Sequence, residues 1–266
     1  MESFGAMLRG WRTARGKSQL ELSLVAGVSS RHLSFVETGK AKPSREMVLT
    51  LSEALAVPLR DRNVLLNAAG FAPVYSESPL EGSALAEVRA ALSHILDASE
   101  PNPTLVVNRR YDILLANEAA LRLVEFFAPR WRGKNNIALM VLEDKGLKPS
   151  IANWTEVAGY VVRRLQEELG ASRSRNPSDD EMLAHATRTE EQLRHLPMTP
   201  TRPPAILVPL QFRRDGLEVD MFTTITTLGT PLDITLHELR IETLFPANET
   251  ARKSFAKISG KRRGYS

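Results

Sequence analysis

The sequence contains no cysteine. This absence excludes disulfide bonds, thiolate metal ligands and a cysteine nucleophile, and it suits the reducing cytoplasm. No apolar run reaches the roughly 18 residues of a transmembrane helix, and the N-terminus lacks the apolar core of a signal peptide. We therefore expect a cytoplasmic protein that makes no membrane contact.

Catalytic motifs are also missing. The sequence has no Gly-x-Ser-x-Gly motif, no phosphate-binding glycine loop and no dinucleotide glycine pattern. His185, His195 and His237-Glu238 lack the short paired spacing of metal ligands, and Asp179-Asp180 resembles charges at the start of a helix. We predict no catalytic residue, no metal and no cofactor.

Acidic residues are outnumbered by basic ones at both ends of the chain. Residues 1–74 hold 10 Lys and Arg against 6 Asp and Glu, residues 75–250 hold 19 against 25, and residues 251–266 hold 6 against none. Polyanions should therefore meet the ends and not the centre. The basic tail, 251–266, is either a solvated terminus or an auxiliary phosphate-binding arm.

What the chain does have is enough apolar residues for two domains: 42% of its 266 residues are hydrophobic. Helical spacing over residues 4–69 predicts five short helices in a first, all-α domain, 1–74. Ser18 and Glu21 have capping-box spacing, Gly27 ends the second helix, and Ser29 caps the third. Two helices joined by such a tight turn form a helix-turn-helix.

In a helix-turn-helix the third helix enters the major groove of DNA. Leu33 and Val36 would face inward, which leaves Arg31 to bond a guanine edge and Phe35 to touch a thymine methyl group. Two alternatives to these DNA contacts stay open. Phe35 could instead cover the core or a partner helix, and His32 could lie on the helix surface without touching a base. The serines can bond a base or a phosphate. Gln19 lies at the start of the second helix, where backbone N–H groups favour a phosphate, and Lys40 and Lys42 in the loop after the third helix also suit phosphates. The predicted DNA-binding residues are Gln19, Ser29, Ser30, Arg31, His32, Ser34, Phe35, Lys40 and Lys42.

The stretch "SQLELSLVAGVSSRHLSFVETGKAKPSREM", together with "PLRDRNVLLNAAGFAP", resembles the Xre (Cro/C1-type) helix-turn-helix family. The resemblance implies that Gln19, Ser30, Arg31, Ser34 and Phe35 face DNA and that Glu37 makes structural bonds. Ser23 stands where the family usually has alanine. That difference bears on packing more than on function.

The segment "VYSESPLEGS", residues 74–83, is rich in Ser, Pro and Gly and indicates a linker. We assign residues 75–84 to the linker and residues 85–250 to a second domain. After a helix from Leu85, "TLVVNRRYDILLANEAALRLVEFF" predicts strand, turn, strand and helix, with Asn117 as the cap. "NIALMVLED" fits a buried strand or a short helix. Two further helices follow, the second started by Ser178 with Glu181 in capping-box register. A hairpin turning at 214–216 and a strand in "ITLHELRIETLFP" complete an α+β domain, an antiparallel sheet with packed helices.

"PTLVVNRRYDILLANEAALRL", "NWTEVAGYVVRRLQEELG" and "DDEMLAHA" resemble the MmyB-like ligand-binding domain, which has a PAS-like fold. The resemblance implies a hydrophobic pocket for a non-covalent, fatty-acid-like ligand. The candidate ligand-binding residues are Leu114, Leu121, Phe127, Met140, Trp154, Val161, Phe212, Met221 and Phe222. The alternative is that these large apolar residues, which are more often plain core, only fill the interior.

Together the two resemblances imply a bacterial one-component transcription regulator. It would bind double-stranded operator DNA, and a small hydrophobic effector would modulate its activity. A single module reads few base pairs, so we expect a homodimer on a palindromic operator. The alternative is a constitutive regulator whose second domain serves only dimerisation or protein interaction. A second domain acting as an enzyme is disfavoured by the missing catalytic residues.

Overall fold

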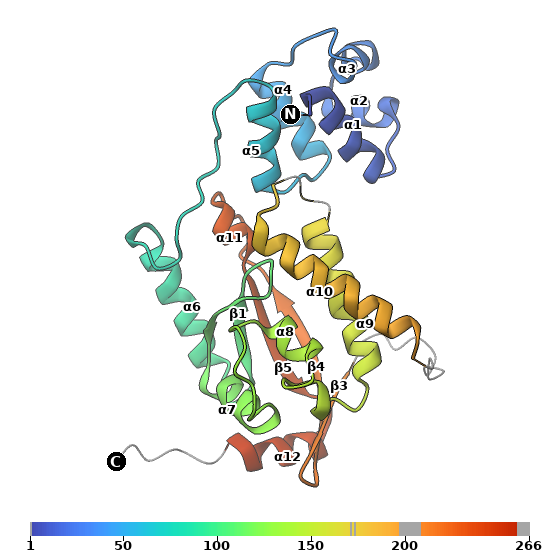
Figure 1. The fold of residues 1–266 in the computed structure, drawn as a ribbon. Coiled ribbons are helices and arrows are strands. Elements are labelled where there is room, and N and C mark those ends of the chain that lie inside the picture. Colours follow the sequence, from blue (N-terminus) through green and yellow to red (C-terminus); the bar gives the residue numbers. More distant parts are fainter. Residues whose placement is uncertain (1, 171, 173, 197–208, 260–266) are drawn as a thin grey trace. The chain divides into compact units, whose positions relative to one another are not determined.

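The chain divides into two compact units in this computed structural model, which describes residues 2–170, 172, 174–196 and 209–259 (Figure 1). The first unit consists of residues 1–78 with 172–174 and 230–237. The second consists of residues 79–171, 175–229 and 238–266. The change from one unit to the next at Ser78 lies within the predicted linker.

The first unit confirms the five predicted helices. They are α1 (Phe4–Ala14), α2 (Gln19–Ala26), α3 (Ser30–Glu37), α4 (Arg45–Ala54) and α5 (Leu59–Ala68). One apolar stripe from each of α1, α3 and α4 meets in a common core, because apolar residues recur at helical spacing. The core includes the fully buried leucines Leu8, Leu22, Leu33, Leu51 and Leu66.

Helix α1 crosses α3 at a glycine. A Cβ atom on Gly5 would lie 2.5 Å from the carbonyl oxygens of both Val36 and Glu37. Contacts this short do not occur between a real Cβ and backbone oxygen. The close approach of the two helices therefore requires glycine at position 5.

The second unit has a five-stranded sheet with helices packed on it, which confirms the predicted α+β class. Strand order is β2-β1-β5-β4-β3, and every neighbouring pair is antiparallel. The strands are β1 (Thr104–Val107), β2 (Ile113–Ala116), β3 (Leu210–Arg214), β4 (Leu217–Thr226) and β5 (Arg240–Pro246). The larger helices are α6 (Ala86–Ala98), α7 (Glu118–Phe127), α8 (Ile137–Leu142), α9 (Trp154–Leu165), α10 (Pro177–Arg194) and α12 (Glu249–Ser259). Shorter segments of this unit are η1 (Ser83–Leu85), η2 (Lys148–Ser150) and η3 (Gln166–Gly170). The short helix α11 (Ile234–Glu238) belongs to the first unit except for its last residue.

Strand pairing fixes which side chains share a face of the sheet. Glu242 on β5 lies opposite Leu105 on β1 and opposite Ile225 on β4. Side chains alternate between faces along a strand, so these three project to the same side. Phe222 and Phe245 project to the other side, where their rings stack with centroids 5.5 Å apart.

Local turn and cap predictions are confirmed. Asn117 accepts a hydrogen bond from the Ala120 amide at 3.0 Å and so caps α7. The β3–β4 hairpin turns at Asp215 and Gly216, both with positive φ (49° and 76°). Positive φ at both central residues is typical of a tight hairpin turn.

The choice left open for "NIALMVLED" falls to a helix, α8, which Asn136 caps by accepting from the Leu139 amide at 2.9 Å. Two local predictions are wrong. Helix α10 begins at a capping box of Asn176 and Asp179, not at Ser178 and Glu181. Part of "ITLHELRIETLFP" is the short helix α11, and only its second half is a strand, β5.

The expectation of a solvated tail is wrong for residues 251–259. They belong to helix α12, in which Ala251 and Phe255 are buried against the core of the second unit. Two apolar residues one helical turn apart give α12 an inward face. The rest of the predicted tail, 260–266, lies outside the described residues.

The substitution Gly5→Ala tests the α1–α3 crossing. It should destabilise the helix-turn-helix unit by roughly 1–3 kcal/mol, because the methyl group forces two backbones apart. Hydrogen exchange of the full chain, followed in peptides from α1 and α3, measures this loss. Gly159→Ala in α9 is the matched control, because a Cβ there meets nothing within 4 Å. Equal protection of α1 and α3 in both variants would contradict the close approach.

Candidate functional site

Helices α2 and α3 are joined by a turn that the local sequence specifies. Ser18 accepts from the Glu21 amide at 3.1 Å, and the Glu21 carboxylate accepts from the Ser18 amide at 2.7 Å. Gly27 then adopts a left-handed conformation, with φ of 64°. Ser29 caps α3 by accepting from the His32 amide at 3.1 Å. The capping box and the Ser29 cap predicted from sequence are confirmed.

The outward face of α3 carries a cation and an aromatic ring. Arg31 and Phe35 are both exposed, and the Arg31 guanidinium lies 5.5 Å from the centre of the Phe35 ring. Lys40 and Lys42 are exposed in the loop that follows, while His32 and Ser34 are half-buried. Within the described residues, the side chains of Arg31, His32, Ser34, Lys40 and Lys42 make no hydrogen bond or ion pair with the rest of the chain, so they remain available to a ligand.

Other predicted DNA-binding side chains have partners within the domain. Gln19 donates to the Glu37 carboxylate at 2.8 Å, and the hydroxyl of Ser30 hydrogen-bonds that of Ser23 at 2.8 Å. Ser29 uses its hydroxyl as the α3 cap. The amide group of Gln19 has two N–H donors, so one is left for a phosphate. Ser23, where the family usually has alanine, therefore ties α2 to α3.

A buried carboxylate joins three helices behind this face. Glu37 accepts from Arg12 at 2.7 and 3.0 Å and from Gln19 at 2.8 Å. Burial by itself would raise the pKa of Glu37, but the hydrogen bonds from Arg12 and Gln19 and the positive charge of Arg12 hold that pKa below its usual value. Glu37 therefore has the structural role that the sequence predicts.

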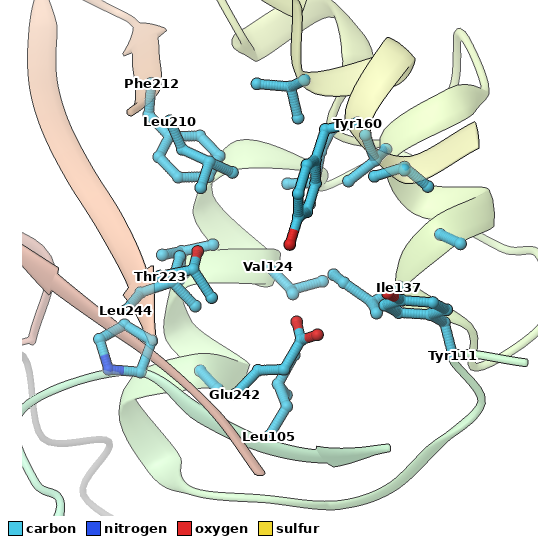
Figure 2. A pocket seen from close by; sticks show the side chains of 18 of the residues that line it. Leu105, Tyr111, Val124, Ile137, Tyr160, Leu210, Phe212, Thr223, Glu242 and Leu244 are labelled. Atoms are coloured by element: carbon cyan, nitrogen blue, oxygen red, sulfur yellow. The ribbon is translucent and has the colours of Figure 1, made fainter. Parts of the chain in front are cut away.

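The second unit has an apolar cavity of about 330 Å³ between the sheet and helices α7, α8 and α9 (Figure 2). Its volume lies at the lower end of the range for small-molecule sites, about 300–1,000 Å³. Most of its wall is apolar. The described residues that line it from the sheet include Leu105, Leu210, Phe212, Thr223, Ile225, Glu242 and Leu244, and those from the helices include Ala120, Leu123, Val124, Ile137, Ala138, Val141, Val157, Tyr160 and Val161.

The polar atoms of the cavity gather around Glu242. In Figure 2 the Glu242 carboxylate and the Tyr160 hydroxyl both point into the cavity. Burial raises the pKa of Glu242 to about 7; Glu168 adds to the increase, and Arg164 and Arg240 oppose it. Burial also raises the pKa of the Tyr111 hydroxyl, which stays neutral.

Only two of the nine predicted ligand-binding residues line the cavity. Val161 and Phe212 line the cavity. Leu114, Leu121 and Met140 line a second, more open hollow beside β2 and α7. The Phe127 ring stacks on the Phe212 ring with centroids 4.8 Å apart, and Met221 is fully buried in the core. Trp154 donates to the Val141 carbonyl at 2.8 Å, and Phe222 lies on the opposite face of the sheet.

Four polar residues line the cavity that were not predicted from the sequence, namely Tyr111, Tyr160, Thr223 and Glu242. In "RIETLFP" the acidic Glu242 stands between Ile241 and Thr243, and Arg240 and Leu244 share its face of the strand. A strand face with two opposite charges gives no signal of a ligand site, so the pattern alone does not single out Glu242.

Neither a metal site nor a membrane segment stands out. Across residues 2–170, 172, 174–196 and 209–259, no group of three or more His, Asp and Glu side chains is arranged to hold a metal ion. His185 lies on α10 and His195 directly follows its end. Over the same residues, no helix combines the length and apolar character that crossing a bilayer requires.

Comparison with known proteins identifies both units. The family model of the MmyB-like transcription regulator ligand binding domain matches residues 88–258, more than half of the chain. The chain belongs to this family. A helix-turn-helix family model matches residues 8–61. The protein is therefore a transcription regulator with a helix-turn-helix DNA-binding domain and a ligand-binding domain, and neither family is a family of enzymes.

The helix-turn-helix is also similar to a named regulator. The chain is 40% identical over 58 residues to the transcriptional regulator ClgR of two Mycobacterium tuberculosis strains, CDC 1551 / Oshkosh and ATCC 25618 / H37Rv. The matching region is 22% of this chain and 52% of ClgR, so the chain spans about half the length of these curated relatives.

The buried Glu37 carboxylate should make the first unit sensitive to acid. Its pKa is lowered by folding, so its contribution is complete above the unfolded pKa of about 4.3 and is lost as the pH falls further. Glu37→Gln should cost roughly 2 kcal/mol at pH 7 and much less at pH 3. Urea unfolding of the full chain at both pH values measures the difference. Glu46→Gln, at an exposed carboxylate of α4, is the control and should stay within about 0.5 kcal/mol of the parent at both. If Glu37→Gln lowers the free energy of unfolding equally at pH 7 and pH 3, the Glu37 carboxylate does not have this charge-dependent role.

Proposed function

We propose that the protein is a bacterial one-component transcriptional regulator that binds operator DNA through α3, under the control of a small hydrophobic effector held in the cavity of the second unit. The observation that carries the proposal is an apolar cavity of about 330 Å³ in a ligand-binding domain that shares its chain with a helix-turn-helix. Such a regulator acts on the chromosome and so works in the cytoplasm.

Recognition of DNA would depend on the outward face of α3. Arg31 would donate two hydrogen bonds to a guanine edge, and Phe35 would contact a thymine methyl group. Ser34 and His32 lie beside them and would bond bases or phosphates. Lys40 and Lys42 would contact phosphates, as would the second N–H of Gln19 at the start of α2.

The regulator would act as a homodimer on a palindromic operator, because one helix-turn-helix buries little surface and contacts few base pairs. An effector would favour one of two dimer arrangements and so one half-site spacing. Coupling of this kind is typically about 1–3 kcal/mol, or roughly 5–150-fold in operator affinity.

The effector would be an elongated apolar compound, with fatty-acid-like molecules as the first candidates. An engineered apolar cavity of about 150 Å³ holds benzene, so a volume of about 330 Å³ leaves room for roughly a dozen non-hydrogen atoms. The alternative, a second domain that serves only dimerisation, fits a filled core better than an apolar cavity.

Mass spectrometry of the purified protein tests the effector. The protein is weighed intact under native conditions and again after denaturation. A stoichiometric apolar compound, released on denaturation, supports the sensor function and supplies a ligand for operator titrations. Full loading with no effect of the released compound on operator binding would favour a structural ligand and a constitutive regulator.

Substitutions on α3 and in the loop should separate base recognition from phosphate contact. Arg31→Ala should cost roughly 1–3 kcal/mol and relax specificity at one base pair. Lys40→Ala should weaken binding to all sequences and reduce the salt dependence by about one phosphate contact. Fluorescence anisotropy with operator and random DNA at several salt concentrations distinguishes the two. If Arg31→Ala binds both DNAs as the parent does, α3 is not the recognition helix.

Filling the cavity should abolish ligand binding and leave DNA binding intact. Val161 lines the cavity, so Val161→Trp places an indole in the space. Leu121→Trp is the matched control, because the Leu121 side chain is 53% exposed and lines only the open hollow. Calorimetric titration with decan-1-ol, a neutral probe of suitable length, should give binding to the parent and to Leu121→Trp but not to Val161→Trp. Equal binding by all three proteins would mean that the cavity is not the ligand site.

A further inference from the structure

One acidic side chain lies in the wall of an otherwise neutral cavity. Glu242 occupies the middle strand of the sheet, with Leu105 of β1 on one side and Ile225 of β4 on the other. The other polar side chains that line the cavity are the hydroxyl groups of Tyr111, Tyr160 and Thr223. No lysine or arginine is among the described residues that line it.

The Glu242 carboxylate has no hydrogen-bond or ion-pair partner among the residues that the structure describes. The nearby Glu168, by contrast, accepts from Arg164 at 2.7 Å. Arg164 also donates to the Tyr160 hydroxyl at 3.3 Å. The Arg164 guanidinium is therefore already paired with a carboxylate, which largely neutralises its charge.

Among the described residues, no positively charged side chain lines the cavity beside Glu242. Tyr111 follows β1, Tyr160 and Arg164 belong to α9, Glu168 belongs to η3, and Arg240 lies two residues away on β5. Arg164 is paired with Glu168, and Arg240 lies outside the cavity lining. A carboxylate ligand would thus meet a second carboxylate at close range, and one of the two would have to take up a proton.

An acceptor without a donor inside an apolar cavity is costly, and a ligand that supplies the donor removes that cost. An ammonium group supplies both donors and the opposite charge, and charge-assisted hydrogen bonds are about twice as strong as neutral ones. The neighbouring hydroxyls can accept the remaining N–H donors.

We infer that the cavity binds an elongated aliphatic amine, with its ammonium group on the Glu242 carboxylate and its chain among the apolar residues of the sheet and of helices α7 to α9. This inference rests on the proposed function, because it identifies the chemical class of the effector at that site. It replaces the carboxylate of a fatty-acid-like ligand with a cationic head group and keeps the apolar chain.

Two probes with the same chain and opposite head groups test the inference. Decylamine and decanoate are titrated calorimetrically into the full chain at pH 6 and pH 8. We expect decylamine to bind at least tenfold more tightly than decanoate at pH 8. Glu242 loses its proton as the pH rises through about 7, while the amine stays protonated, so decylamine should bind more tightly at pH 8 than at pH 6 and decanoate less tightly.

Glu242→Gln keeps the shape of the side chain and removes its charge. The variant should lose at least tenfold in decylamine affinity at pH 8, gain affinity for decanoate, and bind decylamine equally at both pH values. Glu218→Gln on the neighbouring strand β4 is the control, since the Glu218 side chain is 74% exposed. It should match the parent in all four titrations. Thermal melts of both variants establish that the fold is kept.

The outcomes separate this inference from the proposed function. If decanoate binds as tightly as decylamine at pH 8 and Glu242→Gln changes neither, the amine assignment is overturned, while decan-1-ol binding that is blocked in Val161→Trp preserves the proposed function. If no probe binds, both are overturned. A tenfold preference for decylamine that disappears in Glu242→Gln supports both.

Discussion

The alternation of side chains across the five-stranded sheet is the constraint on which the ligand cavity depends. Hydrogen bonds between β1, β5 and β4 fix a register that sets Leu105, Glu242 and Ile225 in one row. A slip of one residue in β5 would turn Glu242 to the other face and bring Thr243 into the cavity. Register therefore decides both the shape of the cavity and the position of its single acidic group.

A buried carboxylate has the corresponding role in the helix-turn-helix. Glu37 holds Arg12 of α1 and Gln19 of α2 against α3, and the close contact at Gly5 fixes how α1 crosses α3. The side chains that remain available on α3 are those not used in these internal bonds. The same physical requirement, that buried polar groups be hydrogen-bonded, thus occupies Gln19 and Ser30 internally and leaves Arg31 and Phe35 outward.

The outward face of α3 could be predicted from sequence because helical periodicity alone separates Leu33 and Val36 from Arg31 and Phe35. The lining of the cavity could not. Large apolar residues mark both core and pocket, so Phe127 and Met221 were as plausible as Phe212. Empty space depends on small residues such as Ala120 and Ala138, whose composition carries no signal of a cavity. Glu242 was missed because its meaning lies in its lack of a partner.

Elements that depend on neighbours up to four residues apart follow from the amino-acid sequence: the capping box of Ser18 and Glu21, the caps at Ser29 and Asn117, and the hairpin turn at Asp215-Gly216. Only tertiary contacts show that α12 packs on the second unit and that an acidic group faces an apolar cavity. The difference arises because caps and turns are closed by local hydrogen bonds, whereas a cavity is formed by strands and helices that are far apart in the chain.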